Sequence, residues 1–447
     1  MIFQRELRSP KRNHLSHNRS AILYHYYAGF SPEFVTDVLK SPDIKPNAII
    51  MDPWNGSGTT TQVAMHRGFS AIGFDINPVM VIVAKAKLFN CDTVIKRSVS
   101  ENLESLIRIA SELRFERLFD EEPLESCLEP NSAECFRRLD RAIQFLMISD
   151  KYDAIYAREN LAHITREASY FYLALFKTLR KFLSSYVSSN PTWIKMPLTK
   201  RPRIHVASEE IYKELRNQVH EMVDIINSCN DMKINIDNTL HIQIERASSE
   251  LIPLQSSSID LVISSPPYCT RIDYAIATSP ELALLGCSMN GDLKNLRDRM
   301  IGTPTMINEI PEVYSDWGPT CRSFLNAVET HNSKASKSYY YRYYIQYFDS
   351  IYRSFLEIDR TLVETGKCLI VVQDSYYKDI NNNLPMIFCE MADSLEWVTL
   401  DRLDFQIKQT MASRNSRTKK YRSSSTATES VLVFEKSRGS NLWKETN

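Results

Sequence analysis

The sequence predicts an α/β fold built on an open, mostly parallel sheet, and three short apolar runs support this prediction. Residues 48–51 form a buried-strand pattern that is followed by a glycine turn and a possible helix start. Residues 70–75 repeat this order of strand and helix. Pro78, which follows them, suits the first turn of a helix that would reach Lys87. Residues 259–264 form a third run. Short apolar runs that alternate with helices are typical of parallel strands covered on both faces.

The glycine turn follows the first strand and indicates a ligand site. Gly56 and Gly58 let the backbone turn sharply and let a ligand approach closely. No lysine follows Gly58, which excludes a Walker loop, and Thr61 stands where a dinucleotide fingerprint has its third glycine. Asp75 ends the next strand, where a carboxylate suits the two hydroxyls of a ribose. These features predict a ligand with an adenosine but no pyrophosphate, such as S-adenosylmethionine (AdoMet).

A second motif, Ser265-Pro266-Pro267-Tyr268, follows the strand at 259–264. With the stretch from Asp52 to Thr60, it resembles the AdoMet-dependent amino-methyltransferases of DNA, which make N4-methylcytosine or N6-methyladenine. The resemblance implies a class I, Rossmann-like methyltransferase fold: a mostly parallel seven-stranded sheet with an antiparallel closing strand, here with a helical insertion. It implies that the catalytic residues are Ser265, Pro266, Pro267 and Tyr268. It implies that the cofactor-binding residues are Tyr27, Phe30, Pro32, Asp52, Pro53, Trp54, Gly56, Gly58, Thr59, Thr60, Asp75, Ile76 and Ser248.

Two positions depart from the family pattern. Trp54 stands where the family has Phe. The acid that contacts adenine in many members is missing, and either Glu245 or Ser248 could replace it. No metal ligand is expected from the motifs.

The chemistry implied by the second motif is methyl transfer to an exocyclic amine. Ser265 Oγ and the Pro266 carbonyl would accept the two N–H bonds of a flipped base and localise its lone pair. A serine before Pro-Pro leans toward cytosine N4 in this family, and adenine N6 is the alternative. Methylation of an RNA base and a non-catalytic AdoMet- and DNA-binding subunit also stay open. A restriction-modification or anti-phage role would add a partner nuclease.

The motifs divide the chain into a discontinuous catalytic domain, residues 1–90 and 236–440, and an insertion. The insertion, 91–235, has helical apolar spacing and is a candidate DNA-recognition region, with a packing or dimerising cap as the alternative. The acidic run 120–122 within it is expected to be a solvated face. Residues 286–337 are expected to form a loop insertion near the active site.

The carboxyl-terminal part carries two further patterns. Six tyrosines between 339 and 347 suggest either a base-stacking platform or, as we favour, a helix packed on the sheet. Runs at 398–407 and 430–434 predict a closing strand pair. The basic stretch between them is predicted to contact the DNA backbone through Arg414, Arg417, Lys419, Lys420 and Arg422.

Composition fits a globular protein without disulfides. The chain has 447 residues, 43% hydrophobic and 24% charged, with a formal net charge of zero, so nucleic-acid binding would need local basic patches. Its nine cysteines form no Cys-x-x-Cys pair, which argues for free thiols. No apolar run approaches the ~20 residues of a membrane span, and no signal-peptide core opens the sequence. We therefore expect a cytoplasmic protein.

Overall fold

The computed structural model of the chain describes most of the sequence. The described residues are 7–11, 23–24, 29, 31–89, 93–114, 119–148, 155–157, 161–186, 194, 202–228, 240–269, 272–306, 309–407 and 427–437.

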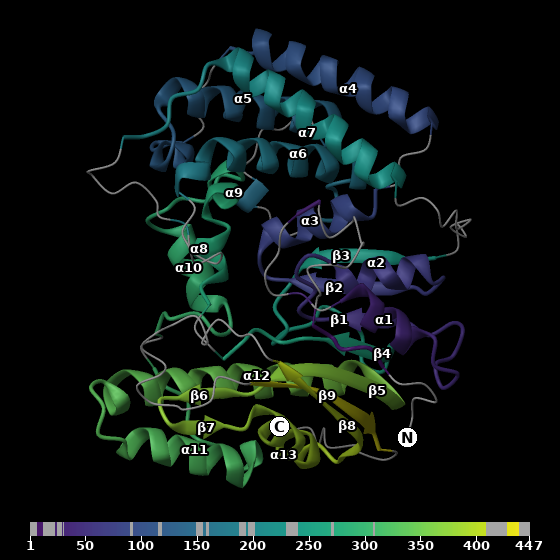
Figure 1. The fold of residues 1–447 in the computed structure, drawn as a ribbon, viewed down its shortest axis with the longest axis vertical. Coiled ribbons are helices and arrows are strands. Elements are labelled where there is room, and N and C mark those ends of the chain that lie inside the picture. Colours follow the sequence, from purple (N-terminus) through teal and green to yellow (C-terminus); the bar gives the residue numbers. More distant parts are fainter. Residues whose placement is uncertain are drawn as a thin grey trace, which may run out of the picture.

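A seven-stranded sheet forms the centre of the structure, in the order β3-β2-β1-β4-β5-β9-β8 (Figure 1). The first five strands in this order are parallel, and β9 is antiparallel to both of its neighbours. The predicted class I fold, with its mostly parallel sheet and antiparallel closing strand, is confirmed. The strands are β1 (Ile50–Asp52), β2 (Ala71–Asp75), β3 (Ile242–Arg246), β4 (Ile259–Ser264), β5 (Leu362–Gln373), β8 (Trp397–Ile407) and β9 (Ala427–Lys436). A separate hairpin pairs β6 (Ser375–Tyr377) with β7 (Ile380–Asn382).

Helices cover both faces of this sheet. One face packs on α1 (Pro32–Leu39) and α2 (Thr59–His66), and α3 (Pro78–Lys87) contacts β2 and β3. Ser31 caps α1, because Phe34 N donates to its Oγ at 3.0 Å, and Pro78 opens α3 as predicted. The other face packs on α11 (Gly318–Thr330), α12 (Arg342–Thr361) and α13 (Leu384–Ser394).

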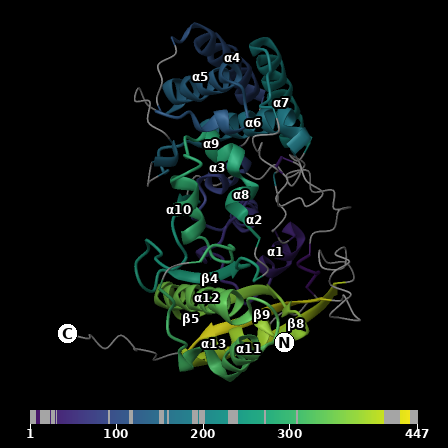
Figure 2. The ribbon, with the colours of Figure 1, turned by 90° about the vertical axis from the view of Figure 1, so that its left-hand side faces the viewer.

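The described part of the insertion is helical, as its apolar spacing predicts, and contains a bundle of four long helices. In both views the bundle occupies one end of the molecule, and α11 and α13 occupy the other end (Figures 1 and 2). The bundle sits on α3, whose Lys85 Nζ donates to the carbonyls of Leu161 (2.6 Å) and Ile164 (3.1 Å). Its elements are α4 (Thr93–Glu112), η2 (Pro123–Ser126), α5 (Pro130–Met147), η3 (Ile155–Ala157), α6 (Arg166–Phe182), η4 (Leu183–Tyr186) and α7 (Ser208–Ser228).

The segment after the second motif joins the same core as the bundle. It contains α8 (Tyr274–Ala277), α9 (Ser279–Leu284) and α10 (Asp292–Arg299). Two arginines of the insertion bind α9: Arg137 donates to the carbonyls of Ala283 and Leu284, and Arg180 pairs with Glu281. The bundle is therefore fastened to the chain that leaves the second motif.

One expectation about local structure was wrong. Residues 286–337 are not a loop throughout, because they include α10, η5 (Ser315–Trp317) and α11. The buried side chains Cys321, Phe324, Leu325 and Val328 of α11 have helical spacing, a signal that the loop prediction overlooked. The π-helix η6 (Ser336–Tyr341) then leads directly into α12.

The acidic run at 120–122 is only partly a solvated face. Asp120 and Glu121 are exposed, but Glu122 is buried and pairs with Arg137 at 2.8 Å. The tyrosine-rich segment agrees with the favoured interpretation: α12 packs on the sheet and buries Tyr343 and Tyr347. Among the described helices, none is long and apolar enough to cross a bilayer.

Candidate active site

The two sequence motifs emerge from neighbouring parallel strands. Ile50 of β1 is in register with Leu261 of β4, so the carboxyl ends of both strands lie at the same rim of the sheet. Ser264 Oγ donates to Asp52 Oδ1 at 2.5 Å across this rim. The loops that begin at Pro53 and Ser265 therefore start side by side.

The glycine turn is shaped by contacts within the chain. Gly56 and Gly58 have φ angles of 48° and 80°, which favour glycine. A Cβ atom at Gly58 would lie 2.7 Å from Ala84 Cβ on α3. The missing side chain at Gly58 therefore lets α2 and α3 pack together, and the predicted close approach of a ligand to Gly58 stays a prediction.

A cavity of about 650 Å³ opens between the two loops and the helical bundle. Nine of the predicted site residues line it: Pro53, Trp54, Asp75, Ile76, Ser248, Ser265, Pro266, Pro267 and Tyr268. Four others, Asp52, Gly58, Thr59 and Thr60, are not among its lining residues. Asp52, Thr59 and Thr60 are buried in the layer that supports the loops.

The remaining predicted residues fall in three groups. Gly56 is buried in the glycine turn, and Pro32 is buried at the first position of α1; neither lines the cavity. Tyr27 and Phe30 lie outside the described residues. The same holds for the predicted DNA-contacting residues Arg414, Arg417, Lys419, Lys420 and Arg422.

Asp75 presents a carboxylate to the cavity. Gly56 N donates to its Oδ2 at 2.9 Å, and Asn77 N donates to its Oδ1 at 2.8 Å. Burial raises the pKa of Asp75 to about 7, against the lowering effect of these two backbone bonds. Each carboxylate oxygen has further acceptor capacity beyond one N–H, so Asp75 can still accept hydrogen bonds from a ligand.

Asp52 lies at the same rim of the sheet, where its carboxylate accepts hydrogen bonds from one residue in the first motif and one beside the second. Its Oδ1 accepts the Ser264 hydroxyl and the Trp54 backbone N–H, the latter at 3.1 Å. Burial raises the pKa of Asp52 to about 6, and the Ser264 hydrogen bond opposes that shift. Asp52 thus joins the starts of both loops.

Of the two candidates for the adenine contact, Glu245 within β3 and Ser248 after it, Ser248 lines the cavity and Glu245 does not. Its Oγ accepts the Glu250 backbone N–H at 3.2 Å. The neighbouring Arg246 side chain donates to the carbonyls of Ile76 (3.2 Å) and Tyr156 (2.8 Å), and its guanidinium lies 5.0 Å from the centre of the Tyr156 ring. Arg246 therefore joins the sheet to the insertion at the edge of the cavity.

The sequence did not predict that the insertion supplies a wall of this cavity. The insertion residues of the wall are Lys177, Arg180, Lys181, Ser184, Gln218 and Glu221. Arg180 is neutralised by Glu281, which is fully buried and also accepts the Tyr24 hydroxyl at 3.2 Å. Lys177 lies 3.7 Å from Glu221. The helical spacing of the three basic residues on α6 was the available signal.

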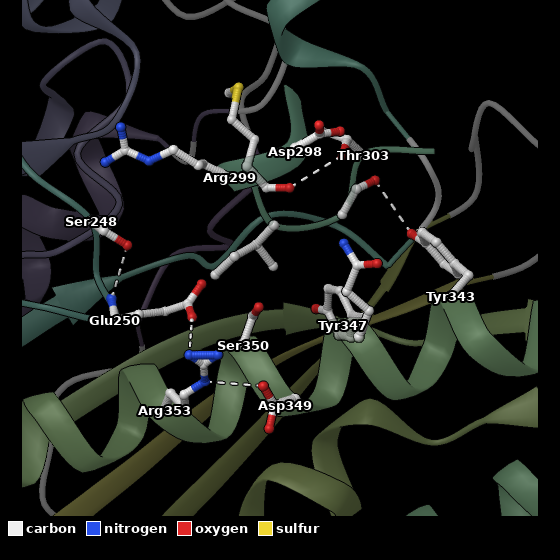
Figure 3. Close-up of a pocket in the computed structure, with 14 residues that line it drawn as sticks. Ser248, Glu250, Asp298, Arg299, Thr303, Tyr343, Tyr347, Asp349, Ser350 and Arg353 are labelled. Atoms are coloured by element: carbon white, nitrogen blue, oxygen red, sulfur yellow. Dashed lines mark hydrogen bonds and ion pairs between the residues drawn. The ribbon is translucent and has the colours of Figure 1, made fainter. Parts of the chain in front are cut away.

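A second cavity, of about 240 Å³, adjoins the first (Figure 3). Both cavities share Ser248 and the stretch 299–301. Its floor is α12, where Arg353 pairs with Asp349 at 3.0 Å and with Glu250 at 3.5 Å (Figure 3). Among the described residues, no group of three or more His, Cys, Asp or Glu side chains could hold a metal ion.

The sheet and the position of the cavity define a class I methyltransferase fold. Comparison with known proteins indicates which methyltransferase family the chain resembles. Residues 3–86 match an N6/N4 family model described as DNA methylase. Over 294 residues the chain is 26% identical to the Type II methyltransferase M.BsoBI of Geobacillus stearothermophilus, covering 61% of this chain and 53% of that protein. The chain thus spans about half the length of that relative. These matches support assignment of the chain to the DNA amino-methyltransferase family, and the resemblance seen in the sequence is confirmed.

Proposed function

We propose that this protein transfers a methyl group from AdoMet to the exocyclic amine of a flipped base in DNA. The observation that supports this most strongly is that one cavity, the larger of the two described above, is lined both by Asp75 and Ile76 and by the Ser265–Tyr268 loop. A methyl donor on one side would then face an amine on the other.

The cofactor side of the cavity suits an adenosine. Asp75 offers acceptors for the ribose hydroxyls, Ile76 offers an apolar surface for the adenine, and Ser248 lies beside them. Pro53 and Trp54 form a second apolar wall. When bound, AdoMet supplies an electrophilic methyl on a sulfonium.

The target side of the cavity suits an amine. Proline has no backbone N–H, so Pro266 and Pro267 offer only carbonyl acceptors to a base. Ser265 Oγ and the Pro266 carbonyl would accept the two amine N–H bonds and draw the lone pair toward the methyl. Tyr268 would stack on the base, which must leave a duplex to enter.

We further propose cytosine N4 as the acceptor, because Ser265 stands before Pro-Pro, with adenine N6 as the alternative outcome of the test. We assign DNA recognition to 91–235 because its Lys177 and Lys181 line the same cavity. The basic residues between 414 and 422 would contact the backbone. The name of the relative motivates a restriction-modification setting with a partner nuclease.

The test is transfer of tritiated methyl groups from AdoMet to DNA of a strain that lacks this gene, followed by mass spectrometry of the nucleosides. We expect N4-methylcytosine. Detection of N6-methyladenine would show that adenine and not cytosine is the acceptor. Label in RNA alone would show that the substrate is RNA. Label in neither nucleic acid would refute the proposed methyltransferase activity. Ser265→Ala should abolish transfer while AdoMet binding persists. Ser256→Ala, in the exposed turn that precedes β4, is the matched control and should keep full activity.

A further inference from the structure

We propose that Tyr347 is a positioning residue for methyl transfer: it holds the Pro267 carbonyl and thereby fixes the direction of the Ser265–Tyr268 loop. This inference rests on the proposed function. Tyr347 comes from α12, 80 residues along the chain from Pro267, and its hydroxyl donates to the Pro267 carbonyl at 3.0 Å.

The donor is buried and well held. Tyr347 is 2% exposed, and its ring packs edge-on against Phe348 with a centroid distance of 5.5 Å. In Figure 3 the Tyr347 side chain rises from α12 beneath the smaller cavity. Burial raises the pKa of Tyr347 well above its ordinary value, so its hydroxyl keeps its proton and remains a donor.

The hydrogen bond acts on the one soft dihedral left at Pro267. The rings of Pro266 and Pro267 fix φ at both positions. Trans peptide planarity fixes ω, so ψ alone sets where each carbonyl points. By holding the Pro267 carbonyl, Tyr347 fixes ψ of Pro267 and with it the plane from which Tyr268 departs.

A second close contact involves the same loop. Gly302 has a φ of 80°, and a Cβ there would lie 2.9 Å from the Tyr268 carbonyl oxygen. The Gly302 carbonyl accepts the hydroxyl of Tyr343, one helical turn before Tyr347, at 3.3 Å. Two tyrosines of one helix thus support the loop: Tyr347 binds the Pro267 carbonyl directly, and Tyr343 binds the Gly302 backbone, which lies close to the Tyr268 carbonyl.

The consequence is pre-alignment of the acceptor groups. Methyl transfer needs the amine and the methyl in line at close range, and a misplacement of about 1 Å can cost ~10²-fold in rate. Without the Tyr347 hydroxyl the loop could rotate about ψ of Pro267, so the groups that bind the amine would be less often aligned. Cofactor binding should not change, because Tyr347 does not line the larger cavity.

The test is Tyr347→Phe, which removes one oxygen and keeps the ring. We expect kcat for methyl transfer to DNA to fall about 10- to 100-fold, with AdoMet affinity and melting temperature close to those of the wild type. Tyr352→Phe is the control: it removes a hydroxyl from the same helix, where that group donates to Asp316 Oδ2 at 3.3 Å, and it should leave kcat unchanged.

Each outcome decides between the alternatives. An unchanged kcat in Tyr347→Phe would overturn the positioning role. A fall in kcat that is accompanied by equal losses in AdoMet affinity and melting temperature would also overturn it, since the role would then be structural. The wild-type arm tests the proposed function separately: transfer by the wild type with an unaffected variant refutes only the inference, whereas no transfer by the wild type refutes the function.

Discussion

Replacement of Arg137 should loosen the attachment of the insertion to α9. The guanidinium is 1% exposed, and its N–H groups all meet acceptors. Glu122 accepts at 2.8 and 3.2 Å, Asp140 accepts at 2.7 Å, and the carbonyls of Ala283 and Leu284 accept at 3.1 and 2.7 Å. Arg137→Leu would leave two buried carboxylates without their counter-ion.

The expected loss of stability follows from the burial of the ion pairs that Arg137 forms. Removing one partner of a buried ion pair costs about 3–5 kcal/mol, because the remaining charge is uncompensated. Hydrogen exchange of peptides from α5 and α9 measures the local opening free energy, and we expect a fall of that size there. Arg97→Ala breaks an exposed pair with Glu101, whose side chains are 86% and 66% exposed, and should change nothing measurable.

A variant that also lacks the charges of Glu122 and Asp140 tests whether these uncompensated charges cause the loss of stability. Adding Glu122→Gln and Asp140→Asn to Arg137→Leu removes both stranded charges and keeps acceptors for Leu124 N and the Tyr172 hydroxyl. This triple variant should recover at least about half of the loss. A loss below ~1 kcal/mol in the single variant, or no recovery in the triple variant, would refute the reasoning from burial.

Two further predictions concern the active site. Gly302→Ala should lower kcat, because its Cβ would press on the Tyr268 carbonyl. Gly68→Ala, at a similar φ of 79° with no atom within 4 Å, should cost similar backbone strain yet keep kcat; equal activity in the two variants would contradict the prediction. Because burial raises the pKa of Asp75 to about 7, AdoMet affinity should weaken as the pH falls below 7, by up to ~tenfold per unit. Calorimetry of the wild type and of Asp75→Asn, whose profile should be flat, checks this, and an equally steep profile in the variant would contradict it.

The parts of the fold that the sequence predicted are those with local signals. The strands β1, β2 and β4 follow from short apolar runs, and their loops follow from glycine and proline at fixed offsets. Because parallel neighbours present their carboxyl ends together, the meeting of Asp75 with the Ser265–Tyr268 loop could be inferred before the structure. The start of α3 at Pro78 was predictable for the same local reason.

The features that the sequence did not predict depend on contacts between distant residues. Arg180 and Glu281 are 101 residues apart, and Tyr347 and Pro267 are 80 apart. No local pattern shows that Glu122, unlike its two acidic neighbours, faces a buried arginine. The tyrosines of α12 looked alike in the sequence, and only the tertiary structure separates Tyr347, which binds the loop, from those that pack in the core.

Under the proposal that the insertion recognises DNA, its attachment to α9 has a consequence for altering target choice by grafting. A donor bundle exchanged at residues 93–228 alone would arrive without partners for Glu281 and for the carbonyls of Ala283 and Leu284. A chimera that also carries residues 273–300 would transfer both halves of these contacts as one unit. A change of target specificity in this fold should therefore exchange both segments, 93–228 and 273–300, together.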